Sequence, residues 1–275
     1  MNFVKLAAAT AGLMLASWGA PGGNRAPPRT PEPAGIAPIL ATPDARDPHS
    51  YAKPLEARVH HVALDLAVDF ENKRIGGTAT LDIQRKPDAR EIVLDSKGLE
   101  IATVADGKGQ PLEWKLGPND EALGAPLQIA LRPDTRRIAI DYKSAPNADA
   151  LQWLAPEQTA GKRHPYLFSQ GQSILNRSWI PTQDSPGIRQ TWEAWIAVPA
   201  GLTAVMSAEK GDKADPTPPP PDRSSFYYAM DNPVAPYLIA LAVGDLEFLQ
   251  VGPRSGGWDC LGGGRRAFLQ HSSGN

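Results

Sequence analysis

The sequence predicts an all-β protein built as curved antiparallel sheets or a sandwich. The first observation is a strict alternation of apolar with polar or small residues over residues 62–70, with apolar side chains at Val62, Leu64, Leu66, Val68 and Phe70. A period of two over nine residues is typical of a strand with one buried face. The second observation is that no segment after residue 50 repeats apolar residues at helical spacing over three turns, whereas short strand-like runs recur between turn residues. Together they favour an all-β architecture.

The first two strands are predicted to form a hairpin, because residues 71–77 carry turn residues and residues 78–84 alternate again. Further strands are expected at residues 91–94, 127–131, 137–142, 191–198 and 226–230, each bounded by Gly, Pro, Asn or Asp. Residues 236–245 are apolar almost throughout. Their β-branched residues, together with Pro236 and Gly244, favour a fully buried strand over a buried helix.

The N-terminal part of the chain differs from this middle region. Residues 1–20 have the proportions of a signal peptide, with Lys5 ahead of a short apolar run. That run is too short to cross a bilayer of about 30 Å as a helix, so no stable membrane span is expected. Residues 15–19 resemble a bacterial lipoprotein box in which Trp18 occupies the position of the lipidated cysteine. We therefore expect export to the periplasm or cell envelope, followed by a Pro-rich disordered linker at residues 21–50.

Composition excludes several classes of function. The net charge of −2, from 28 basic and 30 acidic residues, provides no positive field for nucleic acid. The single cysteine, Cys260, permits neither an intrachain disulfide nor a thiolate metal cage. None of the histidines has the spacing of a zinc-binding helix, and His60 and His61 are expected on opposite faces of one strand. The chain also lacks a nucleophile elbow, a P-loop and a dinucleotide motif, so no catalytic residue and no metal site are predicted in it.

The most specific pattern lies at residues 166–189, which read Tyr-Leu-Phe-Ser-Gln-Gly-Gln-Ser-Ile-Leu-Asn-Arg-Ser-Trp-Ile-Pro-Thr-Gln-Asp-Ser-Pro-Gly-Ile-Arg. This segment resembles the N-terminal domain of the gluzincin zinc aminopeptidases (aminopeptidase N type). Within them it is most similar to the leukotriene-A hydrolase subgroup, which has Tyr-Leu-Phe-Ser-Gln-x-Gln followed by Arg-x-x-x-Pro-x-Gln-Asp-x-Pro. Stretches at residues 198–208 and 236–254 agree, in the same order. The resemblance covers residues 51–254 and implies a saddle-shaped N-terminal β domain beside a thermolysin-like catalytic domain.

The resemblance also implies roles for individual residues. Gln172 is implied to lie at the edge of the substrate cleft and to hold the free α-amino group of a peptide, at a position where most of the family has glutamate. Gln170 matches the neighbouring position, and Ser173 is expected to line the pocket floor. Arg177 and Asp184 match an Arg…Asp pattern, which we expect to be a structural ion pair or a loop clamp.

This chain lacks motifs that the family has, and their absence determines the activity that we expect of this chain by itself. The family continues into a Gly-x-Met-Glu-Asn strand and a His-Glu-x-x-His helix with a downstream glutamate, and these motifs are absent here. Zinc is therefore expected in the complete parent enzyme, which hydrolyses N-terminal residues from peptides, and no cofactor is expected to bind this chain. Residues 255–275 fit no packed pattern. We expect a disordered, aberrant tail on a truncated or frame-shifted copy that lacks its partner, the catalytic domain.

Two other hypotheses for the function of this chain remain open. The first is a free-standing β-sandwich that binds a peptide, sugar or protein in the cell envelope, which an ordered C-terminus would favour. The second is a self-contained hydrolase, which would need two facing carboxylates in a deep pocket.

Overall fold

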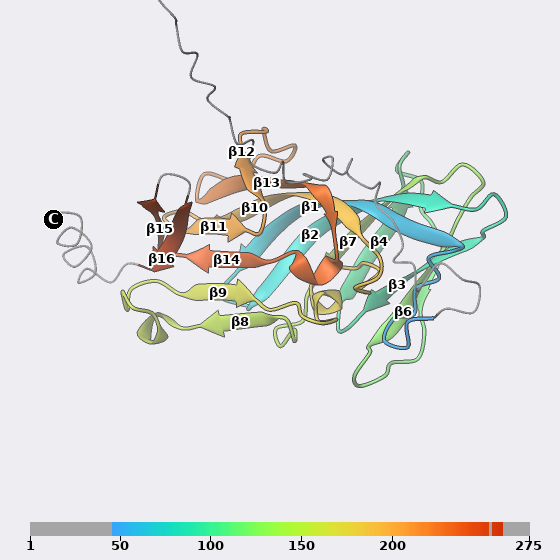
Figure 1. The fold of residues 1–275 in the computed structure, drawn as a ribbon, viewed down its shortest axis with the longest axis horizontal. Coiled ribbons are helices and arrows are strands. Elements are labelled where there is room, and N and C mark those ends of the chain that lie inside the picture. The colour runs from blue at the N-terminus through green and yellow to red at the C-terminus, as the bar shows by residue number, and fades with distance from the viewer. Residues whose placement is uncertain (1–45, 253–254, 261–275) are drawn as a thin grey trace, which may run out of the picture. The chain divides into compact units, whose positions relative to one another are not determined.

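The computed structural model describes residues 46–252 and 255–260, all within one compact unit of the chain. The predicted signal peptide, most of the predicted linker and residues 261–275 lie outside the described residues. The described part is built from four β-sheets and short 3₁₀ turns, so the all-β prediction is confirmed (Figure 1). Within the described residues, no helix has the length and apolar character needed to cross a membrane.

The largest sheet has seven strands. Its strands, in spatial order, are β12 (Glu209–Gly211), β13 (Arg223–Val234), β10 (Gln190–Pro199), β1 (Ala57–Asp69), β2 (Arg74–Arg85), β7 (Arg137–Lys143) and β4 (Glu100–Asp106). Strands β1 and β2 form the predicted antiparallel hairpin. Its turn is held by Asp69, which accepts a hydrogen bond of 3.0 Å from the Asn72 amide. Strands β1 and β10 pair in parallel, so the large sheet is mixed and not antiparallel throughout.

Two residues explain local features of the β1–β2 pair. Gly77 has a φ of +144°, and a Cβ at this position would lie 2.1 Å from the Asp65 carbonyl oxygen, so only glycine fits. At the other end of the pair, Val59 lies opposite Ile83 and His61 lies opposite Asp82, which leaves His60 as an extra residue in a β-bulge. His60 and His61 are both half-buried between buried Val59 and Val62, so the bulge interrupts the alternation on which the expectation of opposite faces depends.

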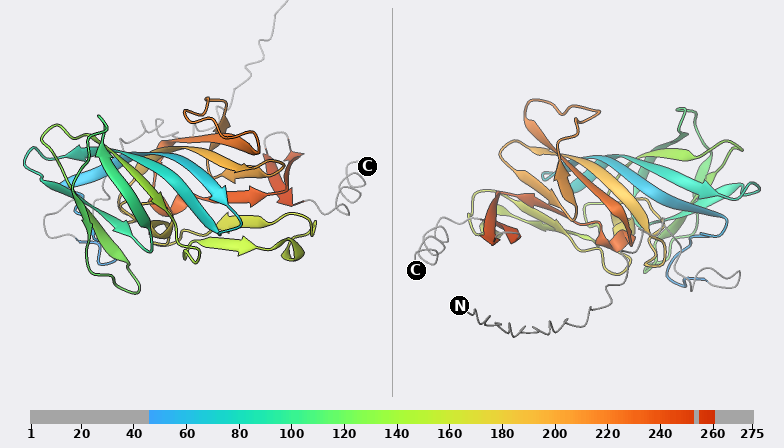
Figure 2. Two further views of the ribbon diagram at one scale, coloured as in Figure 1. Left: turned by 180° about the vertical axis from the view of Figure 1, so that it is seen from behind. Right: turned by 45° about the horizontal axis from the view of Figure 1, so that its top comes forward.

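Three smaller sheets complete the fold. A four-stranded sheet has the order β11 (Thr203–Met206), β14 (Leu241–Gly244), β9 (Tyr166–Ser169) and β8 (Leu151–Leu154). A three-stranded sheet has the order β3 (Glu91–Ser96), β6 (Ala125–Ala130) and β5 (Trp114–Leu116). Strands β15 (Leu246–Gly252) and β16 (Ser255–Cys260) form a hairpin. Figure 2 shows the curvature of the sheets from two further directions.

One continuous hydrophobic core joins the large sheet to the four- and three-stranded sheets. Apolar side chains from all three sheets belong to the same buried cluster, for example Leu64 of β1, Leu127 of β6 and Val243 of β14. Leu64, Leu66 and Val68 are all buried, as the alternation of β1 predicts. The core therefore ties together sheets whose strands lie far apart in the sequence.

The structure differs from the sequence prediction in three places. Residues 236–245 are not one buried strand: a 3₁₀ turn at Pro236–Leu238 leaves Leu238 exposed before β14 begins. Residues 255–260 form strand β16, in place of the expected disorder, because their backbone pairs with β15. The expected linker ends too late, since residues 46–50 already contact the folded domain through Asp47, His49 and Ser50.

Candidate functional site

The predicted site residues lie on one loop, residues 170–187, which we call the site loop. It follows β9 and stays attached to β8, because the Gln170 amide donates a hydrogen bond of 2.8 Å to the carbonyl oxygen of Ala150. Gln170, Gln172 and Ser173 are exposed, whereas Gly171 is buried between the two glutamines. The peptide bond between Gln172 and Ser173 is cis. The loop thus exposes two neutral amide side chains on either side of a buried glycine, at the point where a turn begins at Gln172.

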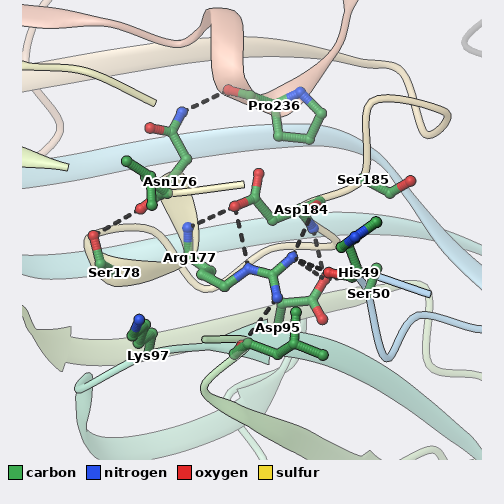
Figure 3. Close-up of polar contacts among 12 residues, drawn as sticks. His49, Ser50, Asp95, Lys97, Asn176, Arg177, Ser178, Asp184, Ser185 and Pro236 are labelled. Atoms are coloured by element: carbon green, nitrogen blue, oxygen red, sulfur yellow. Dashed lines mark hydrogen bonds and ion pairs between the residues drawn. The ribbon is translucent and has the colours of Figure 1, made fainter. Parts of the chain in front are cut away.

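The site loop turns against a buried asparagine. Asn176 donates through Nδ2 to the carbonyl oxygen of Pro236 at 2.6 Å (Figure 3). It also donates to the carbonyl oxygen of Ile239 at 2.9 Å, and its Oδ1 accepts a hydrogen bond of 2.8 Å from the Trp179 indole. These contacts fasten the loop to the 3₁₀ turn before β14. Gly171 packs directly on Asn176, because a Cβ on Gly171 would lie 2.4 Å from the Asn176 Oδ1. The small residue between the two glutamines is therefore a packing requirement.

Arg177 and Asp184 form a buried pair inside the loop. The Arg177 amide donates to Asp184 Oδ2 at 3.0 Å, and its Nε lies 3.4 Å from the same oxygen. The guanidinium also donates to the carbonyl oxygens of Leu123 (2.9 Å), His49 (2.7 Å) and Asp184 (2.9 Å) (Figure 3). Both side chains are about 1% exposed. The pair clamps the two ends of the loop together and ties them to segments distant in the sequence.

Sequence reasoning missed Asp95, the third charged member of this cluster. Its carboxylate accepts hydrogen bonds from the Ser50 hydroxyl (2.6 Å), the Tyr51 amide (2.8 Å) and the Asp184 amide (2.8 Å), and it lies 3.8 Å from Arg177 Nη2. Asp95 follows the buried apolar run of β3 and is itself fully buried. A carboxylate that directly continues an apolar strand is a signal that could have marked it as a buried, partnered charge.

The electrostatics of the cluster follow from its composition of two carboxylates and one guanidinium. Burial raises the pKa of Asp184 to about 6, although Arg177 opposes the shift. Burial also raises the pKa of Asp95, again against the attraction of Arg177. Asp184 Oδ1 has no hydrogen-bond partner among the described residues. The Arg177 guanidinium therefore offsets the cost of burying the Asp95 and Asp184 carboxylates only in part.

A pocket of about 380 Å³ opens beside Ser173. One wall is the site loop and the other is the N-terminal segment; the lining residues are Arg46, Asp47, Pro48, His49, Ser173, Ile174, Ser185, Pro186 and Gly187. Ser173 thus lies in a pocket wall, and Gln172 precedes it directly in the chain. Gln170 and Gln172 do not line the pocket themselves.

The site loop offers binding chemistry. Glutamine amides both donate and accept hydrogen bonds but supply neither a nucleophile nor a general base at neutral pH. Over residues 46–252 and 255–260, no three His, Cys, Asp or Glu side chains come together in a way that could hold a metal ion. The fold and this loop define the class of protein as an all-β domain that carries an exposed polar loop anchored by buried side chains.

The comparisons with known proteins identify the family. Residues 48–238 match the peptidase M1 N-terminal domain, and the chain therefore belongs to this family. The match begins inside the segment predicted to be a linker. This start agrees with the contacts of Asp47, His49 and Ser50, and it places the domain boundary before residue 51.

The similar curated proteins are much longer than this chain. The chain is 38% identical over 222 residues to leukotriene A-4 hydrolase of Xenopus laevis, which covers 77% of this chain and 36% of that protein. It is 35% identical over 221 residues to aminopeptidase B of Mus musculus, which covers 72% of this chain and 33% of that protein. The chain thus spans about a third of the length of these relatives.

Solved structures agree with the sequence relatives. The yeast leukotriene A4 hydrolase in complex with bestatin aligns with a TM-score of 0.70 at 28% identity, covering 79% of this chain and 33% of that one. The M1 zinc metallopeptidase of Deinococcus radiodurans bound to a Tyr-Ser-Ala substrate has a TM-score of 0.54 at 22% identity, covering 72% of this chain and 45% of that one. At that identity the second likeness shows a shared fold.

Proposed function

We propose that this chain is the N-terminal substrate-cleft domain of an exported zinc metallo-aminopeptidase that removes N-terminal residues from peptides. The observation that carries the proposal is the exposed Gln170 and Gln172 pair on a loop fastened by buried Asn176 and Arg177. A loop anchored in this way holds its exposed amides in fixed positions, as a binding site requires. The relatives named aminopeptidase support the same activity for the complete protein.

The proposed contact is between Gln172 and the α-ammonium group of the peptide. An amide oxygen accepts a hydrogen bond from an ammonium group without a countercharge. A hydrogen bond contributes about 0.5–1.5 kcal/mol between neutral groups and about 1.5–3 kcal/mol to a charged group, and a carboxylate would add direct charge attraction to the ammonium group. Glutamine at this position therefore makes recognition of the ammonium group weaker than glutamate would.

Zinc chemistry is not assigned to the described residues. Solved relatives are zinc metallopeptidases, but the described part of this chain contains no group of ligands that fits the metal. A catalytic zinc site needs three protein ligands and an open position for water. We propose that those ligands belong to a catalytic domain outside this chain, and that this chain alone does not hydrolyse peptides.

A domain-replacement experiment tests the role of Gln172. Residues 46–252, which include Asp47 and strand β14, replace the matching domain of mouse aminopeptidase B, and hydrolysis of aminoacyl p-nitroanilides is measured. Gln172→Ala is expected to raise KM and to lower kcat/KM by about tenfold, since one hydrogen bond to a charged group is lost. Gln152→Ala is the control, because Gln152 is also exposed and lies on neighbouring strand β8. Equal kinetics for the two variants in an active chimera would contradict the proposal.

Export is the second part of the proposal, and it is supported by the signal-peptide proportions of residues 1–20. The full chain is expressed in a Gram-negative bacterium, the periplasm is separated, and the N-terminus of the mature protein is sequenced. We expect periplasmic protein that begins near residue 20. Cytoplasmic protein that keeps Met1 to Lys5 would refute export.

A further inference from the structure

A short N-terminal segment, Asp47–Tyr51, is built into the candidate site. We call it the strap. The His49 carbonyl oxygen accepts from Arg177 Nη2 at 2.7 Å, and Asp47 accepts from the Ser185 hydroxyl. The Tyr51 hydroxyl donates to the Gly124 carbonyl oxygen at 3.1 Å. The strap is thus bonded at several points along its length to parts of the fold far away in the sequence.

Asp95 is the residue that holds the strap and the site loop together. One carboxylate oxygen, Oδ1, accepts from the Tyr51 amide of the strap. The other, Oδ2, accepts from the Ser50 hydroxyl of the strap and from the Asp184 amide of the site loop (Figure 3). Because a single fully buried carboxylate serves both segments, neither segment can shift without breaking a buried hydrogen bond.

The strap and the site loop also share the pocket beside Ser173. Asp47 and His49 line it from the strap, and Ser173 and Ser185 line it from the loop. The distance between these two walls sets the width of the pocket. That distance is fixed by the contacts of Asp95, which does not line the pocket, and by the Asp47–Ser185 hydrogen bond between two lining residues.

We propose that Asp95 is a positioning residue that fixes the strap as the second wall of the pocket beside Gln172 and Ser173. The strap is then part of the ligand-binding unit and does not act as a linker. In the aminopeptidase role proposed above, on which this inference rests for its ligand, the pocket receives a side chain of the bound peptide. Asp95 does not touch that peptide and acts through the strap and the loop.

Hydrogen–deuterium exchange of the full 275-residue chain tests the positioning role directly. Asp95→Asn keeps the shape of the side chain but replaces one of its acceptor oxygens with a donor. We expect about tenfold faster exchange in peptides covering both the strap and residues 173–187, since the two segments share this side chain. Its amide nitrogen cannot accept from the Tyr51 amide if it replaces Oδ1, or from Ser50 and the Asp184 amide if it replaces Oδ2. Ser50→Ala removes the hydroxyl contact from the strap to Asp95, leaves the Tyr51 and Asp184 contacts in place, and is expected to accelerate exchange in the strap first. It provides the test if Asp95→Asn does not fold.

The control is Ser225→Ala, which removes a Ser–Asp hydrogen bond to Asp215 in a different loop. It should leave exchange in the strap and in residues 173–187 unchanged. Faster exchange confined to residues 91–97 in Asp95→Asn would show that Asp95 stabilises its own strand only, and would overturn the proposal.

Kinetics of the aminopeptidase B chimera then separate positioning from general stability. Asp95→Asn is expected to raise KM while kcat stays unchanged at a temperature where both proteins are folded. If Asp95→Asn speeds exchange in the strap but leaves KM unchanged, the strap is not a wall of the pocket and the proposal is refuted. An inactive chimera with the unmodified domain would refute the proposed function, whereas the exchange experiment would still decide whether Asp95 positions the strap.

Discussion

At the scale of single residues, the site depends on a small set of buried polar side chains that fix an exposed loop. Asn176, Arg177 and Asp184 have about 1% exposure or less, and their hydrogen bonds go mostly to backbone atoms of other segments. Such contacts cost desolvation but specify one arrangement of the chain. The exposed Gln170 and Gln172 gain their fixed positions from residues that no ligand would touch.

Asp184 gives the domain a predictable response to pH. Its pKa rises from the usual 3.8 to about 6 on folding, so the folded state holds the proton more tightly than the unfolded state does. The stabilisation from this protonation is fully present below about pH 4 and is lost as pH rises through about 6.

Asp184→Asn is expected to remove this part of the pH dependence. The substitution adds a donor where Asp184 Oδ1 lacks a partner among the described residues, and it keeps an acceptor for the Arg177 amide. The measurement is the free energy of unfolding in urea between pH 4 and pH 7 for both proteins. The difference between the two curves isolates Asp184 from carboxylates such as Asp82, whose pKa is lowered by Arg137 and which give the opposite slope. Parallel curves would contradict the prediction.

At the scale of elements, one side chain joins the large sheet to the three-stranded sheet. Gln183 accepts a hydrogen bond of 2.9 Å from the Val59 amide of β1 through Oε1. Its Nε2 donates to the carbonyl oxygens of Ala57 (3.0 Å) and Val93 (3.2 Å), which belong to β1 and β3. These backbone groups lie beside the β-bulge, where the regular ladder between β1 and β2 is interrupted.

Gln183→Ala is expected to lower the free energy of unfolding by about 2–4 kcal/mol. The variant leaves three buried backbone groups without their partner, and each unsatisfied group costs about 1–3 kcal/mol before water enters the space. Gln152→Ala, with an exposed side chain, should change stability by no more than about 0.5 kcal/mol. Chemical denaturation of the 275-residue chain measures both. Similar values for the two variants would show that the sheets do not depend on Gln183.

The elements differ in how well the sequence predicts them. Strand β1 and its hairpin partner follow from local alternation and turn residues, and the structure confirms them. The parallel pairing of β1 with β10 does not follow from local pattern, because its residues lie about 130 positions apart and only the common core brings them together. The strap was missed because its polar and proline-rich sequence resembles a linker, whereas its order depends on Asp95 and Arg177.

The residues of the candidate site also differ in how well the sequence predicts them. The pattern at residues 166–189 predicted which residues belong to the loop, and the structure brings Arg177 and Asp184 into contact. Asp95 lies about 80–90 positions earlier in the chain, on β3, so its contacts with Asp184 and Ser50 are visible only in three dimensions. A buried charged residue that comes from a different sheet cannot be recognised from the spacing of residues in the sequence.

At the scale of the whole molecule, the described residues form a domain whose stability comes from packing. One buried cluster joins the large sheet to the four- and three-stranded sheets. The chain spans about a third of the length of relatives such as leukotriene A-4 hydrolase, and the solved relatives include zinc metallopeptidases. Packing that is complete within this domain would separate its folding from the metal chemistry that we propose for the complete protein.

Chelation of metal is therefore expected to leave the folding of this chain unchanged. A zinc-dependent domain gains stability from the metal in proportion to RT ln(1 + [Zn]/Kd), about 4 kcal/mol at a thousandfold excess over Kd, and EDTA removes that gain. The described residues offer no cluster of ligands from which such a gain could come. The purified 275-residue chain should give the same Tm with and without EDTA, and elemental analysis should find no stoichiometric zinc. One zinc per chain together with a lower Tm in EDTA would place a metal site among residues outside 46–252 and 255–260, and would refute the separation of folding from metal binding.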